Sequence, residues 1–241
     1  MHCIALLLFL AGIGFATARA LLAHGAKGVL ICARNEDDCN EAVQNLALEF
    51  PSSKNDIVAC VCDVSTTEGR KMLLLRTQAA FGGILHGLVN NVGRNVRKDF
   101  SQQTEAEYDS MMKTNVDSAY FLCQLFQDIL AHTSQDMNME TTGMSTSVVN
   151  VASAAGVQSS GTGAVYGMSK AAMIHFSKIL ACEWAKLNIR VNAGKLPHVH
   201  WTYSTQHSCI QNTHLTFLLT LFQFSCSLDD NDTHAKRCCE S

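Results

Sequence analysis

The chain has 241 residues, of which 47% are hydrophobic and 16% are charged, and its formal net charge is −3. This composition supplies a substantial buried core and suits one α/β domain or two small ones. The slight negative charge and the lack of a basic run argue against nucleic-acid binding. Eleven cysteines, an odd number, are scattered along the chain, which favours buried thiols over a disulfide framework.

The first twenty residues allow two interpretations. Residues 3–14 are almost wholly apolar and are followed by small-x-small patterns, so a secretory signal within residues 1–20 stays open. No Lys or Arg precedes this run, and glycines interrupt it. We therefore favour a core strand followed by a turn, in a cytoplasmic protein without a membrane span.

The middle of the chain alternates short β-branched runs with longer segments of helical periodicity. The predicted buried strands are residues 28–33, 57–62, 85–90 and 147–151. The predicted helices are residues 35–50, 66–81, 104–132 and 165–186. Asn35, followed by three acidic residues, predicts one helix N-cap. This alternation predicts an α/β fold with a doubly wound parallel sheet, whose ligand sites lie at the carboxyl ends of the strands.

The composition changes after Asn192. Residues 196–228 contain no Asp, Glu, Lys or Arg, and they show no clean periodicity. We therefore predict a domain over residues 1–192 and a poorly ordered or loosely packed tail over residues 193–241. A metal-binding tail would use His198, His200, His207 and Cys209. Their irregular spacing favours chance enrichment, and we expect no metal.

The segment from Tyr166 to Lys170, with Ser153 thirteen residues before the tyrosine, is the strongest candidate for chemistry. On a helix, Tyr166 and Lys170 share a face one turn apart. An ammonium beside a phenol favours the phenolate, against a gap of roughly 4 kcal/mol between a tyrosine of pKa ~10 and neutral pH. Such a tyrosine suits acid catalysis of ketone reduction and base catalysis of the reverse reaction. Alone, this spacing is more often a surface pair.

Together with Asn90-Asn91-Val92-Gly93, Leu180–Ala185 and Asn188–Asn192, these residues resemble the short-chain dehydrogenase/reductase family, and within it the tropinone-reductase-like branch. The resemblance covers about residues 11–192 and implies a Rossmann-like fold.

The resemblance also implies catalytic roles for four residues. Ser153 would hydrogen-bond the substrate carbonyl, and Tyr166 would pass it a proton. Lys170 would lower the pKa of the tyrosine while holding the nicotinamide ribose. Asn115 falls where the family places the asparagine that anchors a proton-relay water. Alternatively, Ser153 is an ordinary strand-end hydroxyl and Asn115 satisfies a helix irregularity.

The same resemblance implies a cofactor site. Gly12-Ile13-Gly14 resembles the end of the glycine-rich turn, where a helix N-terminus receives pyrophosphate. Asp63 and Val64 match the segment that contacts adenine, and Asn90 with Gly93 matches the motif that braces the central strand and borders the adenine ribose. Each glycine has a competing interpretation as a turn or cap.

Cofactor choice depends on the end of the second strand. Cys32-Ala33-Arg34 offers no carboxylate for a ribose 2′-hydroxyl, whereas the guanidinium of Arg34 suits a 2′-phosphate. We therefore expect NADP(H). The competing interpretation of Arg34 is a solvated loop charge.

Two departures from the family pattern bear on activity. Leu7-Leu8 stands where the family has a Thr-Gly pair, and residues 193–197 stand where it continues with a Pro-Gly element, a substrate-covering loop and a final strand. The expected sheet therefore lacks its last strand and leaves residues 189–192 at an edge.

The first functional hypothesis is an NADP(H)-dependent oxidoreductase that reduces a small or alicyclic ketone to the alcohol, or runs the reverse reaction. The alternative is a catalytically weak or inactive truncated paralogue, which keeps the fold and a dimer interface through the helices at residues 117–132 and 165–186. A secreted or membrane-associated protein is a third, less favoured class.

Overall fold

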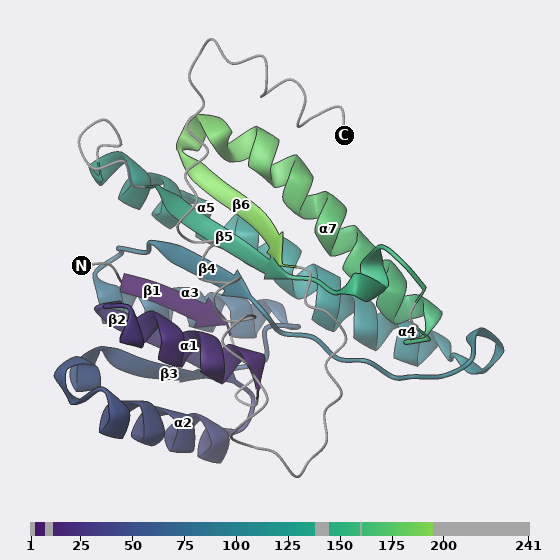
Figure 1. Ribbon diagram of the computed structural model, residues 1–241, viewed down its shortest axis with the longest axis horizontal. Coiled ribbons are helices and arrows are strands. Elements are labelled where there is room, and N and C mark those ends of the chain that lie inside the picture. Colours follow the sequence, from purple (N-terminus) through teal and green to yellow (C-terminus); the bar gives the residue numbers. More distant parts are fainter. Residues whose placement is uncertain (1–2, 8–11, 138–144, 160, 195–241) are drawn as a thin grey trace.

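A computed structural model describes residues 3–7, 12–137, 145–159 and 161–194, with backbone alone for residues 3–7, 54 and 55. Within these ranges the strands form one parallel sheet in the order β3-β2-β1-β4-β5-β6. The strands are β1 (Cys3–Leu7), β2 (Gly28–Ala33), β3 (Ile57–Val61), β4 (Gly87–Asn90), β5 (Thr146–Val151) and β6 (Ile189–Gly194). The doubly wound parallel sheet predicted from the sequence is confirmed (Figure 1).

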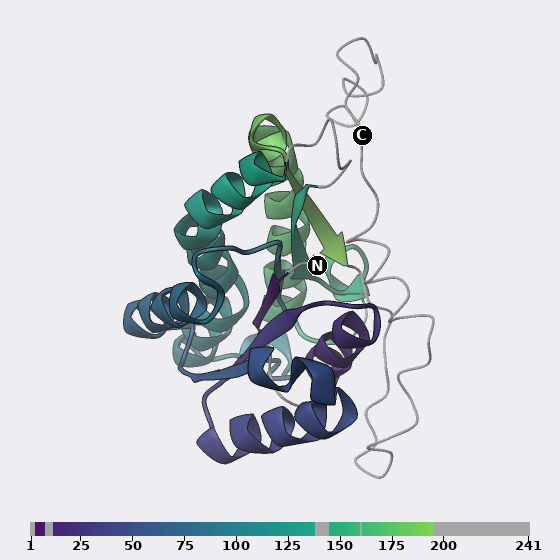
Figure 2. The same cartoon turned by 90° about the vertical axis from the view of Figure 1, so that its left-hand side faces the viewer.

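The helices cover both faces of this sheet. They are α1 (Ile13–Ala23), α2 (Glu36–Glu49), α3 (Thr67–Phe81), α4 (Glu105–Met112), α5 (Ser118–Asp136) and α7 (Ala164–Trp184). Apolar side chains of α1 and α2 pack on one face of the sheet, and those of α3, α5 and α7 pack on the other. In Figure 2, α1 (purple) and α5 (teal) lie on opposite sides of the sheet.

Local sequence explains where these helices begin. The side chain of Asn35 accepts hydrogen bonds from the amides of Asp37 and Asp38, which confirms the predicted N-cap of α2. Thr66 caps α3 by accepting from the amide of Gly69. Thr104 and Glu107 form a reciprocal capping box at the start of α4.

The structure differs from the predicted elements in one instructive place. The single helix expected over residues 104–132 is divided by a π-helical turn, Lys113–Asp117, into α4 and α5. The amide of Ser118 bonds to the oxygen of Lys113, five residues back. A π-turn of this kind is a frequent mark of functional sites in helices.

Two expectations concern the ends of the described chain. In the described part of the sheet, β6 pairs with β5 alone and is an edge strand, as expected. Leu8 and the tail from residue 195 onward lie outside the described residues. Among the described helices, none combines the length and apolar character needed to cross a bilayer.

Candidate active site

Ser153 and Tyr166 meet where the carboxyl end of β5 faces the first turn of α7. Ser153 follows β5 and accepts a hydrogen bond from the amide of Ala155 at 3.2 Å, which begins a short 3₁₀ turn, Ala154–Gly156. The half-buried phenol of Tyr166 is near enough to the Ser153 side chain that hydrogen bonding with it lowers the pKa of the phenol. The structure therefore brings together the serine and tyrosine that the sequence singled out.

A glycine allows the serine-bearing turn to approach α7 closely. A Cβ on Gly156 would lie 2.6 Å from the main-chain carbon of Lys170 and 2.7 Å from the amide nitrogen of Ala171. Both are closer than carbon and nitrogen atoms can approach without moving the backbone. The turn after Ser153 thus rests directly on the backbone of the helix that carries Tyr166.

Lys170 lies below the tyrosine on the same face of α7. Its Nζ atom is 5.7 Å from the centroid of the Tyr166 ring and donates a hydrogen bond of 2.7 Å to the oxygen of Val151. The side chain is buried. This burial disfavours the charged ammonium and lowers the pKa of Lys170 to about 8.

Burial and the neighbouring Ser153 act on the pKa of Tyr166 in opposite directions. Burial raises the pKa of Tyr166, because desolvation penalises the phenolate, and the hydrogen bond with Ser153 opposes this rise. Ser153 is therefore a neighbour that lowers the pKa of the phenol, and the expectation that Lys170 also lowers it stays a prediction. The lysine contributes through its contacts and position.

Asn115 is buried in the π-helical turn and is held on three sides. Its Oδ1 accepts from the amide of Arg94 at 2.8 Å, while its Nδ2 donates to the oxygen of Arg94 at 2.9 Å and to Oγ of Ser169 at 3.0 Å. Ser169 in turn donates to the main-chain oxygen of Tyr166 at 2.8 Å. These bonds connect Asn115 to the helix of Tyr166 and Lys170.

Ser169 is a site residue that the sequence reasoning missed. It is fully buried and precedes Lys170 on α7. Its place inside the segment from Tyr166 to Lys170 was the only sequence feature that pointed to it. Its hydrogen-bond partner Asn115 lies 54 positions away in the sequence. Only the fold brings the two side chains together.

Gly93 and Asn90, both expected at the cofactor site, occupy different surroundings. A Cβ on Gly93 would lie 3.4 Å from Nζ of Lys170 and 3.5 Å from Oδ1 of Asn115, so Gly93 borders the catalytic candidates. Asn90 is buried in the sheet instead. Its Nδ2 donates to Oδ1 of Asn150 at 2.8 Å, and Asn150 donates to Ser177 of α7 at 2.8 Å. Asn90 therefore connects β4 to β5 and, through Asn150, to α7, while its expected place beside the adenine ribose stays a prediction.

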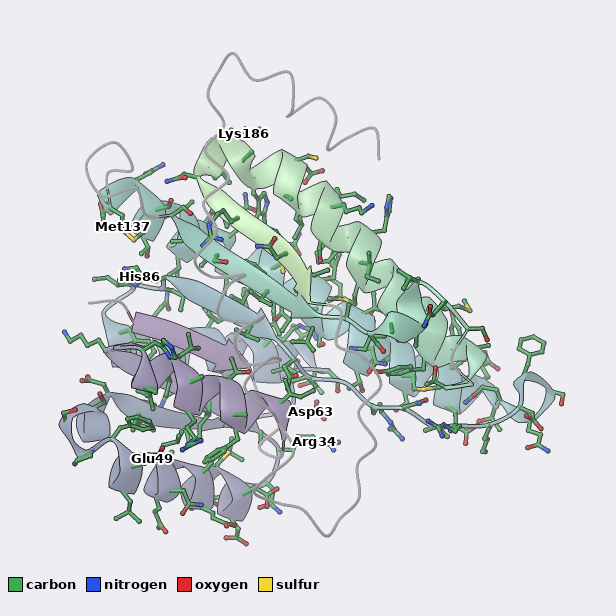
Figure 3. All side chains as sticks on the ribbon, viewed as in Figure 1. Arg34, Glu49, Asp63, His86, Met137 and Lys186 are labelled. Atoms are coloured by element: carbon green, nitrogen blue, oxygen red, sulfur yellow. The ribbon has the colours of Figure 1, made fainter. Side chains whose placement is uncertain are left out.

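A cavity of about 350 Å³ opens at the carboxyl ends of β2, β3 and β4. It is lined by the expected Arg34, Asp63 and Val64, and also by Cys32, Ala33, Cys62, Val92, Arg94, Asn95 and Thr114. Figure 3 shows Arg34 and Asp63 near one another at this edge. The guanidinium and the carboxylate give the cavity both a phosphate-binding group and a hydrogen-bond acceptor, which fits an adenosine phosphate.

The start of α1 also fits a dinucleotide. Gly12 has a φ of 83°, a backbone conformation that favours glycine, and α1 begins directly after it at Ile13. Gly14 is buried in the first turn. Free amides at such a helix start favour an anion. Leu8, the departure expected to disturb this turn, lies outside the described residues.

The chain is similar in structure to sugar and polyol oxidoreductases. The structure of L-sorbose reductase from Gluconobacter frateurii complexed with NADPH and L-sorbose is 26% identical, with a TM-score of 0.71, over 80% of this chain and 68% of that chain. NAD⁺-bound xylitol dehydrogenase is 24% identical, with a TM-score of 0.73, over 83% of this chain and 72% of that one. The similarity to xylitol dehydrogenase shows a shared fold alone.

Sequence relatives are more similar. A tropinone reductase homolog of Arabidopsis thaliana is 37% identical over 182 residues, which cover 76% of this chain and 62% of that protein. A tropinone reductase homolog of Datura stramonium is 35% identical over 182 residues, with the same coverage of each chain. The chain thus spans about three fifths of the length of these relatives. The family model of the short chain dehydrogenases matches residues 9–209, and the chain belongs to that family, with relatives among the tropinone reductase homologs.

Proposed function

We propose that this protein is an NADP(H)-dependent oxidoreductase that reduces a small or alicyclic ketone to its alcohol, or catalyses the reverse reaction. The observation that carries the proposal is the grouping of three side chains: Ser153 is near enough to Tyr166 to lower the pKa of its phenol, and the buried Nζ of Lys170 lies 5.7 Å from the centroid of the tyrosine ring. A hydroxyl pair over a buried amine suits proton delivery to a carbonyl oxygen.

The residues at the strand ends would hold the dinucleotide. The amides at Gly12, Ile13 and Gly14 would receive the pyrophosphate, while Asp63 and Val64 would contact the adenine. Gly93 would border the cofactor beside Lys170, and the Lys170 ammonium would hold the nicotinamide ribose. When bound, the cofactor supplies or accepts the hydride.

The four polar side chains of the site would manage the proton. Ser153 would orient the substrate carbonyl by donating to its oxygen, and Tyr166 would donate the proton that converts the developing alkoxide to the alcohol. Burial raises the pKa of Tyr166, so the phenol stays protonated at neutral pH, ready for reduction. Lys170 and Asn115 would form the path by which that proton is replaced.

Arg34 supports NADP(H) over NAD(H). It follows β2 and lines the cavity with Asp63, so a 2′-phosphate placed there would meet a permanently charged, planar donor. The similar L-sorbose reductase was solved with NADPH, whereas the similar xylitol dehydrogenase was solved with NAD⁺. The preference therefore depends on this chain's own Arg34.

Titration of the purified chain with NADPH tests the proposal. Enhanced nicotinamide fluorescence that saturates at micromolar cofactor, followed by ketone-dependent NADPH oxidation with a panel of small alicyclic ketones, is expected. Tyr166→Phe should bind NADPH but not oxidise it. Lack of binding at millimolar NADPH by the folded protein would reject the function for this chain.

One observation supports the dimer interface that the alternative, a paralogue with weak or no activity, would keep. Apolar side chains are exposed on α5 and α7: Tyr120 (47%), Phe121 (40%) and Ile179 (43%). The ring of Tyr120 contacts that of Phe176 at 5.3 Å between centroids, which joins the two helices in one surface. A dimer through this surface that binds no cofactor would select the alternative, whereas a dimer that binds NADPH fits the first proposal. Sedimentation of the protein and of Phe121→Glu, with and without NADPH, separates the two.

A further inference from the structure

Three cysteines gather at the carboxyl ends of β2 and β3. Cys32 and Cys60 are opposite each other in the register of the two strands, and the amide of Cys62 donates to the oxygen of Ala33 at 2.8 Å. The Sγ atom of Cys62 lies 3.3 Å from that of Cys32 and 3.7 Å from that of Cys60. All three thiols are buried and unbridged.

Two of these three cysteines are among the residues that line the proposed cofactor cavity. Cys32 and Cys62 line it together with Arg34 and Asp63, and Cys60 is not among the described lining residues. Small solutes that enter the cavity therefore come close to the Cys32–Cys62 pair, which is shielded from bulk solvent. The proposed proton chemistry at Tyr166 makes no use of either thiol.

We propose that Cys32 and Cys62 form a reversible disulfide that restricts the adenosine end of the cavity. The bond itself stands apart from the proposed function, whereas its effect on nicotinamide dinucleotide rests on that function. The contact distance between the sulfurs makes this pair the favoured one, because Cys60 is farther from Cys62 and lies outside the cavity wall.

A peroxide can drive the reaction with all atoms accounted for. One thiol loses its proton and attacks hydrogen peroxide, which forms a sulfenic acid and hydroxide, and the hydroxide takes up the proton as water. The second thiol then attacks the sulfenic sulfur, so that the S–S bond forms and a second water leaves. The two thiols lose two electrons and the peroxide gains them. Hydrogen bonding with Cys32 and burial raise the pKa of Cys62 to about 12, so the rate should rise with pH.

Bond formation would act on the cavity through neighbouring residues. A disulfide holds its sulfurs about 2 Å apart, which draws Cys32 and Cys62 about 1 Å closer than their 3.3 Å contact. Arg34 lies two residues after Cys32, and Asp63 directly follows Cys62. The cross-link therefore ties together the two segments between which an adenosine phosphate would sit.

Peptide mapping tests the bond. The reduced, folded full chain is treated with hydrogen peroxide at pH 7 and pH 9, and the remaining thiols are then blocked with N-ethylmaleimide before digestion with trypsin without reductant. Cleavage after Lys27, Arg34, Lys54 and Arg70 gives Cys32 in residues 28–34 and both other cysteines in residues 55–70. We expect these two peptides joined by a bond that dithiothreitol releases.

Matched variants assign the partner. Cys60→Ala should keep the joined peptides, whereas Cys32→Ser and Cys62→Ser should each lose them, with circular dichroism as the check that every variant is folded. The proposal is overturned if folded wild-type protein yields the two peptides unjoined. It is also overturned if the joined peptides persist in Cys62→Ser, since Cys60 would then be the partner.

NADPH titration tests the consequence. Fully cross-linked protein should bind NADPH about tenfold more weakly than reduced protein or worse, which corresponds to about 1.4 kcal/mol, and dithiothreitol should restore the affinity. Equal affinity in the two forms would overturn the restriction of the cavity. Failure of the reduced protein to bind NADPH would count against the proposed function, while the peptide map alone would still decide whether the bond forms.

Discussion

The Nζ atom of Lys170 donates a 2.7 Å hydrogen bond to the main-chain oxygen of Val151, the last residue of β5. Ser153 lies two residues beyond that oxygen, and Tyr166 lies one helical turn before the lysine. The bond therefore fixes the serine-bearing segment against the helix that carries the tyrosine. In this arrangement the lysine acts on the spacing of the two hydroxyl groups.

Replacing Tyr166 by Phe should strongly slow ketone reduction and leave the cofactor cavity intact. Loss of a positioned proton donor costs on the order of 10²–10⁴ in rate, so kcat should fall by that factor while the Kd for NADPH changes little. Steady-state kinetics and fluorescence titration measure the two quantities. Tyr108→Phe, on α4 and partly exposed, is the control. Retention of full activity in Tyr166→Phe would exclude the phenol as the proton donor.

Lys170→Met should stabilise the protein at neutral pH. The shift in the pKa of Lys170 from 10.5 to about 8 corresponds to about 3 kcal/mol of lost stability when the amine is protonated. Loss of the bond to Val151 offsets about 1 kcal/mol of the gain. The free energy of unfolding should therefore rise by roughly 2 kcal/mol in the variant at pH 7.

The stability of the wild type should also depend on pH, in a direction set by the lowered pKa of Lys170. Between pH 8 and 10.5 the unfolded chain binds a proton at Lys170 that the folded chain has released, so the stability of the wild type rises with pH in this window. The advantage of Lys170→Met should shrink over the same window. Denaturant unfolding at pH 7 to 10.5 measures it, with the exposed Lys178→Met on the same helix as control. A pH-independent difference between wild type and Lys170→Met would contradict the buried-amine account.

Ser169→Ala and Ser177→Ala should separate positioning from stability. Both serines are buried on α7, and each accepts from an asparagine amide and donates to a main-chain oxygen of the same helix. Each substitution leaves a buried amide without that acceptor, at a cost of about 1–3 kcal/mol. Ser169→Ala alone should also lower kcat and shift its pH profile, because it releases Asn115 from the helix of Tyr166. Identical kinetics in the two variants would assign Ser169 a structural role only.

Arg34→Glu should reverse the cofactor preference. Loss of a charge-assisted bond to the 2′-phosphate costs about 1.5–3 kcal/mol, so the affinity for NADPH should fall at least tenfold while that for NADH holds or rises. Binding titrations with both cofactors measure the ratio. Arg19→Ala is the control, since Arg19 pairs with Glu49, which Figure 3 shows well away from Arg34. An unchanged ratio in Arg34→Glu would exclude Arg34 as the residue that sets the cofactor preference.

The strands, the N-cap at Asn35 and the grouping of Ser153 with Tyr166 could be predicted from the sequence, because periodicity, capping and motif spacing are local signals. The π-turn around Asn115 left no signal in the periodicity, since a change of one residue in helical hydrogen bonding does not disturb the apolar pattern of the flanking helices. Only the alternative interpretation of Asn115 pointed to a helix irregularity there. The rise in the pKa of Tyr166 depends on what buries the ring, which is set by packing between distant segments. The contact of Cys32 with Cys62 likewise depends on strand register, which the sequence does not state.

Gly156 has a hydrogen atom where every other residue has a side chain, and this lets the turn that carries Ser153 lie close to the helix that carries Tyr166. Because the turn contacts the backbone of Lys170 and Ala171 directly, even an alanine at position 156 would push β5 and α7 apart. The added methyl group would therefore change the distance between the hydroxyl groups of Ser153 and Tyr166. The spacing of Ser153 and Tyr166 thus depends on a position without a functional group, where a substitution would displace the two hydroxyl groups and leave every proposed catalytic residue in place.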